Sequence, residues 1–282
     1  MLPHRLSDAE RSAWERDGFF LRRGVFGAAE VAALRAASER VAVRAERAAA
    51  EGGRGYQIDG NRYCEAAGAT IQFEHAPGSR TIRVIEPFHH LDAELSRVLD
   101  DPRLVEPMRD LVGCEAVSLF TDKLNLKRPR EGSRFRWHQD SPYWAHFCSH
   151  LERLPNAMVA LDDADEANGC LRVVAGSHTR GCLPGLEGDG RLGPLFTDPR
   201  GFDLSRQVPA VMRAGSALFF HPHAVHGSEP NRSDQARRAF VVTYQPAGHQ
   251  MFRLDAERRL GREADRESAD AQRASGDRSA TA

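Results

Sequence analysis

Cysteine is scarce in this sequence. The chain has five cysteines, an odd number, and none of them forms a Cys-x-x-Cys pair: Cys64, Cys114, Cys148, Cys170 and Cys182. A disulfide framework needs an even set and a thiolate zinc site needs closely spaced pairs, so the sequence disfavours both. We therefore expect a reduced, cytoplasmic protein.

Long apolar runs and a charge excess are also missing. No segment approaches the roughly 20 apolar residues of a membrane-spanning helix, and the polar start MLPHRLSDAERSAWERDG does not fit a signal peptide. The 39 basic and 40 acidic residues give a formal net charge of -1, so no global field favours nucleic acid or a membrane surface. We expect a small-molecule partner, no nucleic acid and no membrane. The sequence does not indicate an oligomeric state.

The N-terminal part, residues 1–114, is expected to be mainly helical. Ser7 and Glu10 match a capping box, which predicts a helix start, and a short strand should follow near Phe19. Residues 28–50 are rich in Ala, Glu and Arg with helical apolar spacing. Asp101 precedes a proline, which is typical of an N-cap and a first helical turn.

The pattern changes at residue 115. Up to residue 247, short apolar segments alternate with Gly, Pro, Asn and Asp clusters, which is typical of an all-β sandwich or barrel: AVSLF, RFRWH, AMVAL, LRVVA, SALFF and AFVVTY. The length fits one large domain, which we assign to residues 1–252. Residues 253–282 have almost no apolar side chains, so we expect a polar, flexible tail or a frayed helix.

A His-x-Asp triplet, His138-Gln139-Asp140, is the sharpest local signal. On an extended segment residues i and i+2 face the same side, so His138 and Asp140 can bind one ion. Two histidines and one carboxylate on one face, with open positions, are the ligand set of non-haem iron oxygenases. The triplet alone is weak evidence because short motifs match by chance. A third ligand must come from elsewhere in the chain.

His226 supplies the second half of the pattern. It follows the apolar segment 216–220, and turn residues then lead to a returning strand, 237–244, which predicts a hairpin with a polar site at its mouth. Arg237, at the start of that strand, has small apolar neighbours. Its planar guanidinium suits a two-pronged grip on the distal carboxylate of 2-oxoglutarate. The alternative is a salt bridge to an acidic loop.

These motifs resemble the phytanoyl-CoA dioxygenase family, which includes ectoine hydroxylases. The resemblance rests on His138-x-Asp140, His226, Ser228 and Arg237, on KLNLKRP (123–129), NGCL (168–171) and GSH (176–178), and on DGFF (17–20) with GVF (24–26). Together these segments cover most of residues 10–245. The resemblance implies a fold that is mainly β with flanking α-helices around a double-stranded β-helix, the cupin-like jelly roll.

The resemblance also implies residue roles and co-reactants. The metal ligands would be His138, Asp140 and His226, the co-substrate contacts Arg237, Ser228 and Asn125, and the candidate substrate contacts Lys127, Gln139, Tyr143 and Trp144. The co-reactants would be Fe(II), 2-oxoglutarate and O2. Related halogenases carry a small residue at the carboxylate position, so Asp140 favours a hydroxylase.

Lysine occurs only twice, at Lys123 and Lys127. Strand alternation places both on one face with Asn125, where their compact charges would suit close approach to an anion; the alternative is two exposed lysines. A basic run near the expected site suggests an anionic substrate, although such runs are typical of solvated faces: Lys127, Arg128, Arg130, Arg134 and Arg136.

We therefore expect an Fe(II)- and 2-oxoglutarate-dependent dioxygenase that hydroxylates an unactivated C–H bond of a small molecule and releases succinate and CO2. Desaturation, epimerisation and ring formation stay open as outcomes. Two alternatives of another class also stay open: a non-oxygenase cupin-type metalloenzyme and a catalytically silent metal-binding jelly roll. Neither His221 nor His223 has both a serine two residues on and an arginine eleven residues on, as His226 has, so we interpret them as orienting residues. The sequence does not select among acyl-CoA, amino-acid-derived, phosphonate and natural-product substrates.

Overall fold

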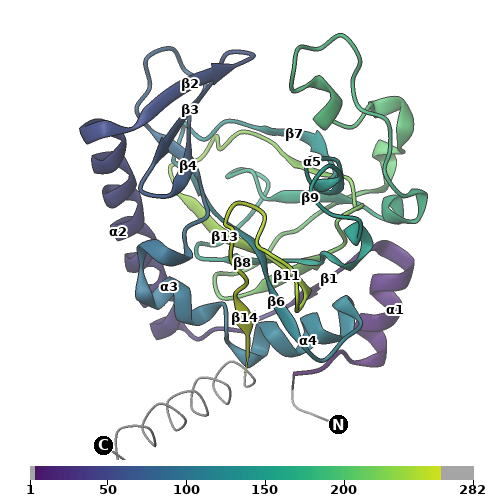
Figure 1. Cartoon of the computed structure of the whole chain (residues 1–282). Coiled ribbons are helices and arrows are strands. Elements are labelled where there is room, and N and C mark those ends of the chain that lie inside the picture. The colour runs from purple at the N-terminus through teal and green to yellow at the C-terminus, as the bar shows by residue number, and fades with distance from the viewer. Residues whose placement is uncertain (1–3, 262–282) are drawn as a thin grey trace, which may run out of the picture.

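Two antiparallel β-sheets form the centre of the protein in a computed structural model that describes residues 4–261 (Figure 1). The larger sheet has the order β1 (Phe19–Arg22), β11 (Ala217–Phe220), β8 (Asn156–Ala160), β13 (Arg237–Pro246), β6 (Val117–Lys127), β5 (Ile82–Glu86), β4 (Ala69–Phe73), β3 (Asn61–Ala66), β2 (Arg54–Ile58), with β14 (Arg259–Leu260) paired to β6. The smaller sheet has the order β10 (Gln207–Pro209), β9 (Leu171–Val174), β12 (His226–Ser228), β7 (Phe135–His138). The expected cupin-like jelly roll is confirmed, and each of the six apolar segments after residue 115 forms a strand.

Apolar side chains build a core on each side of the larger sheet. Strand β8 shows why, because its alternate residues face opposite sides. Met158 and Ala160 pack toward the smaller sheet with Val173, whereas Ala157 and Val159 pack toward the helices. The larger sheet is therefore covered on both faces, which explains the nearly continuous apolar sequence of its central strands.

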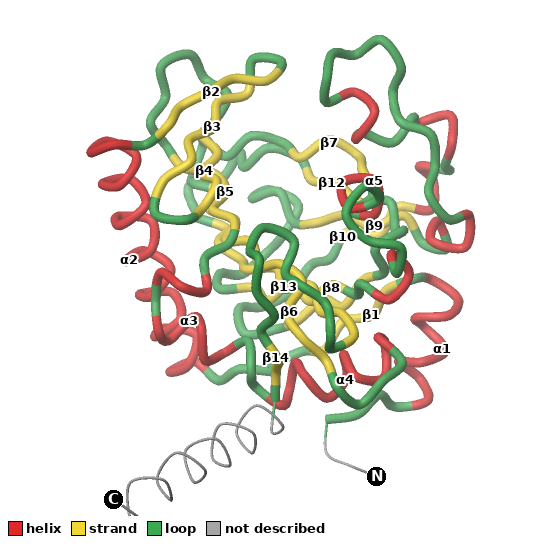
Figure 2. Tube along the Cα trace, in the orientation of Figure 1, coloured by secondary structure: helices red, strands yellow, loops and turns green. Residues whose placement is uncertain are grey.

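The longer helices lie at the periphery, outside the strands (Figure 2). They are α1 (Asp8–Asp17), α2 (Ala28–Gly52), α3 (Ala93–Val98), α4 (Pro102–Val112) and α5 (Ser141–Trp144), with short 3-10 turns at His89–Leu91, Leu151–Arg153, Ser177–Arg180, Gly193–Leu195, Pro199–Gly201 and Leu204–Arg206. The predicted capping box of α1 is present, and Asp101 caps α4 by accepting from Arg103 N. No helix in residues 4–261 is long and apolar enough to span a membrane.

The N-terminal part is less purely helical than expected. The predicted short strand near Phe19 is present as β1, which pairs with β11, and residues 1–114 also contribute β2 to β5, which extend the larger sheet and were not predicted. Residues 54–57 of β2 are exposed at the edge of the sheet, so this strand lacks the apolar alternation that would have revealed it.

Residues 253–261, which were expected to belong to a flexible tail, are held against the body of the protein. Arg259–Leu260 pair with β6, Leu260 is buried, and an Arg258 guanidinium nitrogen lies 2.8 Å from a carboxylate oxygen of Asp100. A single buried leucine, the pairing to β6 and an ion pair therefore fix a segment that composition alone classified as tail. The rest of the predicted tail, 262–282, lies outside the described residues.

Candidate metal and co-substrate site

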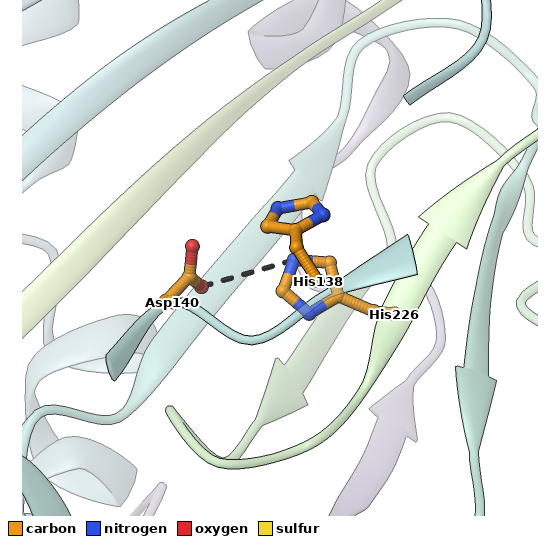
Figure 3. Close-up of side chains that lie close together, drawn as sticks. All are labelled: His138, Asp140 and His226. Atoms are coloured by element: carbon orange, nitrogen blue, oxygen red, sulfur yellow. Dashed lines mark ion pairs between the residues drawn. The ribbon is translucent and has the colours of Figure 1, made fainter. Parts of the chain in front are cut away.

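His138, Asp140 and His226 meet where the smaller sheet ends (Figure 3). His138 ends β7, His226 begins β12, and these two residues are directly paired across the antiparallel strands. One potential ligand atom from each of the three residues lies within 4.8 Å of the others. Asp140 is not extended as expected, since its backbone is helical (φ -76°, ψ -34°) at the start of α5. The turn into α5, rather than strand alternation, brings its carboxylate beside the histidines.

Hydrogen bonds place a proton on Nδ1 of both imidazole rings and fix the ring orientation. Nδ1 of His138 donates to the carbonyl of Arg136 at 2.7 Å, and Nδ1 of His226 donates to the carbonyl of Ala224 at 3.0 Å. A carbonyl only accepts, so each Nδ1 carries a proton, and Nε2 is the ring nitrogen left to bind a metal. Burial, together with the nearby His226, lowers the pKa of His138 to about 3, which keeps its ring neutral.

The carboxylate completes a donor set that fits Fe(II). Burial alone would raise the pKa of Asp140, but His226 and Lys123 outweigh it and lower the pKa, so the group is ionised. Its Oδ2 lies 3.8 Å from Nε2 of His226, a separation that one ion can bridge. Two imidazoles and one carboxylate are the facial set of non-haem iron sites.

Arg237, the expected co-substrate arginine, is buried and has no acidic partner in the part of the chain that the structure describes. One terminal nitrogen donates to the carbonyl of Gly169 at 2.9 Å, whereas its Nε has no hydrogen-bond partner in the described part of the chain. Burial lowers the pKa of Arg237 to about 10. The neighbouring Arg238, on the opposite face, bonds to Asp162 and Glu39 instead. Arg237 therefore forms no salt bridge within residues 4–261, against the salt-bridge alternative, and its guanidinium, with Nε free, fits the distal carboxylate of 2-oxoglutarate.

Lys127 lies in the same buried region and is not exposed. Its Nζ donates to Oγ of Ser228 at 2.8 Å, to the carbonyl of Gly169 at 3.4 Å and to the carbonyl of Glu229. Burial, with the nearby charge of Arg237, lowers the pKa of Lys127 to about 6. The structure thus brings Lys127, Ser228 and Arg237 together around one glycine carbonyl. Their common position associates Lys127 with the co-substrate end rather than with the substrate.

Asn125 occupies the expected position between the two lysines on β6. Its side chain makes no hydrogen bond with residues 4–261, so its amide is available to a bound molecule. It pairs across the sheet with Ala239, whose small side chain leaves the face open.

The candidate substrate residues separate into two groups. Tyr143 packs edge-on against His138 with ring centroids 5.9 Å apart, and burial raises the pKa of its hydroxyl. Trp144 is 1% exposed and packs on Phe120, so its ring mainly contributes apolar packing beside the site. Gln139 does not fit the expected role: its amide donates to the carbonyls of Gly181 and His223, and its oxygen accepts from Leu183 N. Its side chain ties loops together behind the site.

The basic run contributes less free charge than its sequence suggests. Three of its arginines form surface ion pairs: Arg128 with Glu39, Arg130 with Asp234 and Arg136 with Asp189. These arginines are therefore largely neutralised by acids, as expected for a solvated face.

His221 and His223 are not part of the metal cluster. Nδ1 of His223 bonds to Oγ of Ser141 at 2.6 Å, and Nδ1 of His221 accepts from the backbone N–H of His223 at 3.0 Å. Ser141 directly follows a metal-ligand candidate, so His223 orients the segment that carries Asp140. The interpretation of both histidines as orienting residues agrees with these contacts.

Arg83 is a buried cation that the sequence reasoning missed. Arg83 is the extra residue of a β-bulge between β4 and β5. The bulge turns its side chain to the same side of the sheet as the side chain of Val84, which pairs with Asn125 on β6. Its guanidinium lies 4.0 Å above the Phe135 ring, and its Nε has no partner among the described residues. Lys127 contacts the same ring. No sequence signal announces a bulge that forms only through strand pairing.

Comparisons with known proteins agree with this geometry. The profile of the family "Phytanoyl-CoA dioxygenase (PhyH)" matches residues 14–239. An ectoine dioxygenase of Bordetella parapertussis is 30% identical over 262 residues, covering 85% of this chain and 75% of the relative. A methylphosphonate hydroxylase of Gimesia maris is 32% identical over 175 residues, covering 61% and 62%. The crystal structure of EctD from S. alaskensis in its apoform superimposes with a TM-score of 0.67 at 25% identity, covering 89% of this chain and 81% of that chain. The chain therefore belongs to the phytanoyl-CoA dioxygenase family.

Proposed function

We propose that this protein is an Fe(II)- and 2-oxoglutarate-dependent dioxygenase that hydroxylates a C–H bond of a small molecule and releases succinate and CO2. The observation that carries this function is the combination of two features. The His138, Asp140 and His226 donor set lies at the end of β7, just before α5 and at the start of β12, and a buried arginine without an acidic partner among residues 4–261 begins β13. Family membership and the relatives described above support the same reaction class.

The protein's own residues bind and orient the reactants. Bound iron, 2-oxoglutarate and O2 supply the oxidising chemistry, which the protein does not perform itself. Arg237 offers a two-pronged contact to the distal carboxylate, and Ser228 and Lys127 provide further donors beside it. Asn125 offers a free amide on the same face. The three metal ligands leave open positions for the oxoacid and for O2.

Succinate formation tests this function. Purified protein is incubated with Fe(II), ascorbate, O2 and 2-oxoglutarate, beside Asp140→Ala and Arg237→Gln. Arg238→Gln is the matched control, because Arg238 is the adjacent arginine but faces Asp162. We expect succinate from the wild type and from Arg238→Gln, and a loss of about 100-fold or more in the other two variants.

The same assay separates the alternatives. A cupin-type metalloenzyme of another class would bind metal but would neither bind nor consume 2-oxoglutarate. A silent jelly roll would bind metal, and 2-oxoglutarate if Arg237 serves that purpose, without producing succinate under any condition. Either result would contradict the proposed function.

We further propose that the protein acts in the cytoplasm on a small molecule. The five cysteines are all free, which suits a reducing compartment. We also propose that this small molecule is anionic.

A further inference from the structure

Lys123 carries an ammonium group that lies beside the candidate metal ligands and makes no hydrogen bond with the side chains or backbone of residues 4–261. Its Nζ is 3.9 Å from Oδ1 of Asp140 and 4.0 Å from Oε1 of Glu86, and it lies 5.6 Å from the centre of the Trp144 ring. Both oxygen distances exceed hydrogen-bond length. The side chain is 25% exposed, so its N–H donors are accessible to a molecule bound next to the metal.

Glu86 does not neutralise this region, because it serves two cations. Its Oε1 accepts from Oγ1 of Thr121 at 2.9 Å, and its Oε2 lies 3.6 Å from a guanidinium nitrogen of Arg253. One buried carboxylate between Lys123 and Arg253 leaves one positive charge in excess. Asp140 does not remove that excess, since its charge is committed to a bound metal.

The position of Lys123 along β6 separates it from the co-substrate end. Lys123, Asn125 and Lys127 share one face of the strand, and Lys127 lies beside Arg237. Four residues of extended chain span about 13 Å. The distal carboxylate held by Arg237 therefore cannot also satisfy Lys123.

We propose that Lys123 binds the acid group of the primary substrate, with Arg253 as a second cation at the same end. This inference rests on the proposed function and names a substrate class: small carboxylates or phosphonates. Because Lys123 lies within 4 Å of a metal-ligand candidate, the oxidised C–H bond is only a few bonds from the acid group. Trp144 and Tyr143 form the wall against the carbon skeleton.

Anaerobic binding to the Fe(II) and 2-oxoglutarate complex tests this assignment without turnover. The probes are ectoine, L-proline and methylphosphonate, with L-prolinamide and dimethyl methylphosphonate as analogues that lack the anionic group. The proteins are wild type, Lys123→Gln, Lys123→Arg and Arg253→Gln. Arg130→Gln is the control, because Arg130 is an exposed cation paired with Asp234. The readout is the change in the metal-centred absorption spectrum on probe addition, together with the separate affinity for 2-oxoglutarate.

We expect at least one acid to bind the wild type and its analogue without the anion to bind about tenfold more weakly or not at all. Lys123→Gln should weaken the acid about tenfold or more, Lys123→Arg should retain most of the binding, and Arg130→Gln should change nothing. Three outcomes overturn the inference: equal binding of acids and their analogues, no binding by any acid, or a loss in Lys123→Gln that falls on 2-oxoglutarate. Failure of the wild type to bind 2-oxoglutarate would instead contradict the proposed function.

Discussion

The side-chain amide of Asn156 donates to Oδ2 of Asp140 at 3.0 Å inside the jelly roll. The amide cannot turn around, because its oxygen accepts from Oγ1 of Thr243 at 2.6 Å. All three residues are buried, at 1% to 5% exposure. A carboxylate held in this way presents a fixed edge to a metal, since buried hydrogen bonds to ligating groups set their orientation. The two hydrogen bonds from Thr243 to Asn156 and from Asn156 to Asp140 thus link β13 and β8 to the metal site.

Removal of the Asn156 amide should weaken metal binding. For Asn156→Ala we expect a loss of about 10- to 100-fold in Fe(II) affinity, the usual effect of losing a partner of a ligand. Thr243→Val should have a smaller effect in the same direction, because it only frees the amide to rotate. Competition with a chromophoric chelator measures both variants anaerobically.

Ser118→Ala is the control for this loss. Ser118 is also fully buried, and its hydroxyl donates to the carbonyl of Pro246, but it lies at the start of β6, whereas Lys123 beside Asp140 lies further along the strand. Equal metal affinities in the wild type and Asn156→Ala would show that the contact with Asp140 does not orient the ligand.

We expect Lys127 to lower the free energy of unfolding while it contributes to co-substrate binding. In the folded protein its pKa is about 6, against an ordinary value of 10.5. Between these values the unfolded chain holds a proton that the folded chain lacks, so this residue makes the free energy of unfolding rise with pH. Lys127→Met should be about 1–3 kcal/mol more stable at pH 7 and less dependent on pH over this window.

The same variant should bind 2-oxoglutarate about tenfold more weakly or worse, because a donor beside Arg237 is lost. Urea unfolding at pH 7 and pH 9 and anaerobic titration with 2-oxoglutarate measure the two effects. A variant that is less stable yet binds 2-oxoglutarate normally would refute the role given to Lys127.

Gly169 should tolerate no side chain. Its φ is +74°, and an added Cβ would lie 2.2 Å from the carbonyl oxygen of Glu229 and 2.8 Å from Nζ of Lys127. Gly169→Ala should therefore cost about 2 kcal/mol or more and weaken 2-oxoglutarate binding, since its carbonyl also holds Arg237. Gly78→Ala is the control: φ is +73°, but nothing lies within 4 Å of the added Cβ.

Gly78→Ala should cost only about 1 kcal/mol, the strain of the left-handed backbone. Chemical denaturation compares the two alanine variants. Equal losses would mean that the crowding around Gly169 has no energetic consequence.

The sequence predicted the parts of this protein that local chemistry decides. The ligands His138 and His226 and the buried cation Arg237 are visible as residue types at a spacing that strand alternation and a hairpin make meaningful. The helix starts were predicted for a similar reason, because the caps at Ser7 and Asp101 are local hydrogen bonds.

The missed features depend on contacts between distant segments. Asn156 reaches Asp140 only because β8 lies between β11 and β13, and Arg83 faces the site only because a bulge redirects it. Gln139 was misassigned because neighbouring positions in a motif do not share a face. Glu86 and Arg253, which are 253 - 86 = 167 residues apart in the sequence, are brought together by the fold.

Anaerobic titration of the Fe(II) protein with 2-oxoglutarate tests the central claim most directly. We expect the absorption band of an iron-bound oxoacid to appear and to saturate at one equivalent per chain in the wild type. We expect no band in His226→Ala and a dissociation constant raised by about 100-fold in Arg237→Gln, with Arg238→Gln unchanged. If no band forms in the wild type at any 2-oxoglutarate concentration, or if Arg237→Gln binds as tightly as the wild type, the account is contradicted.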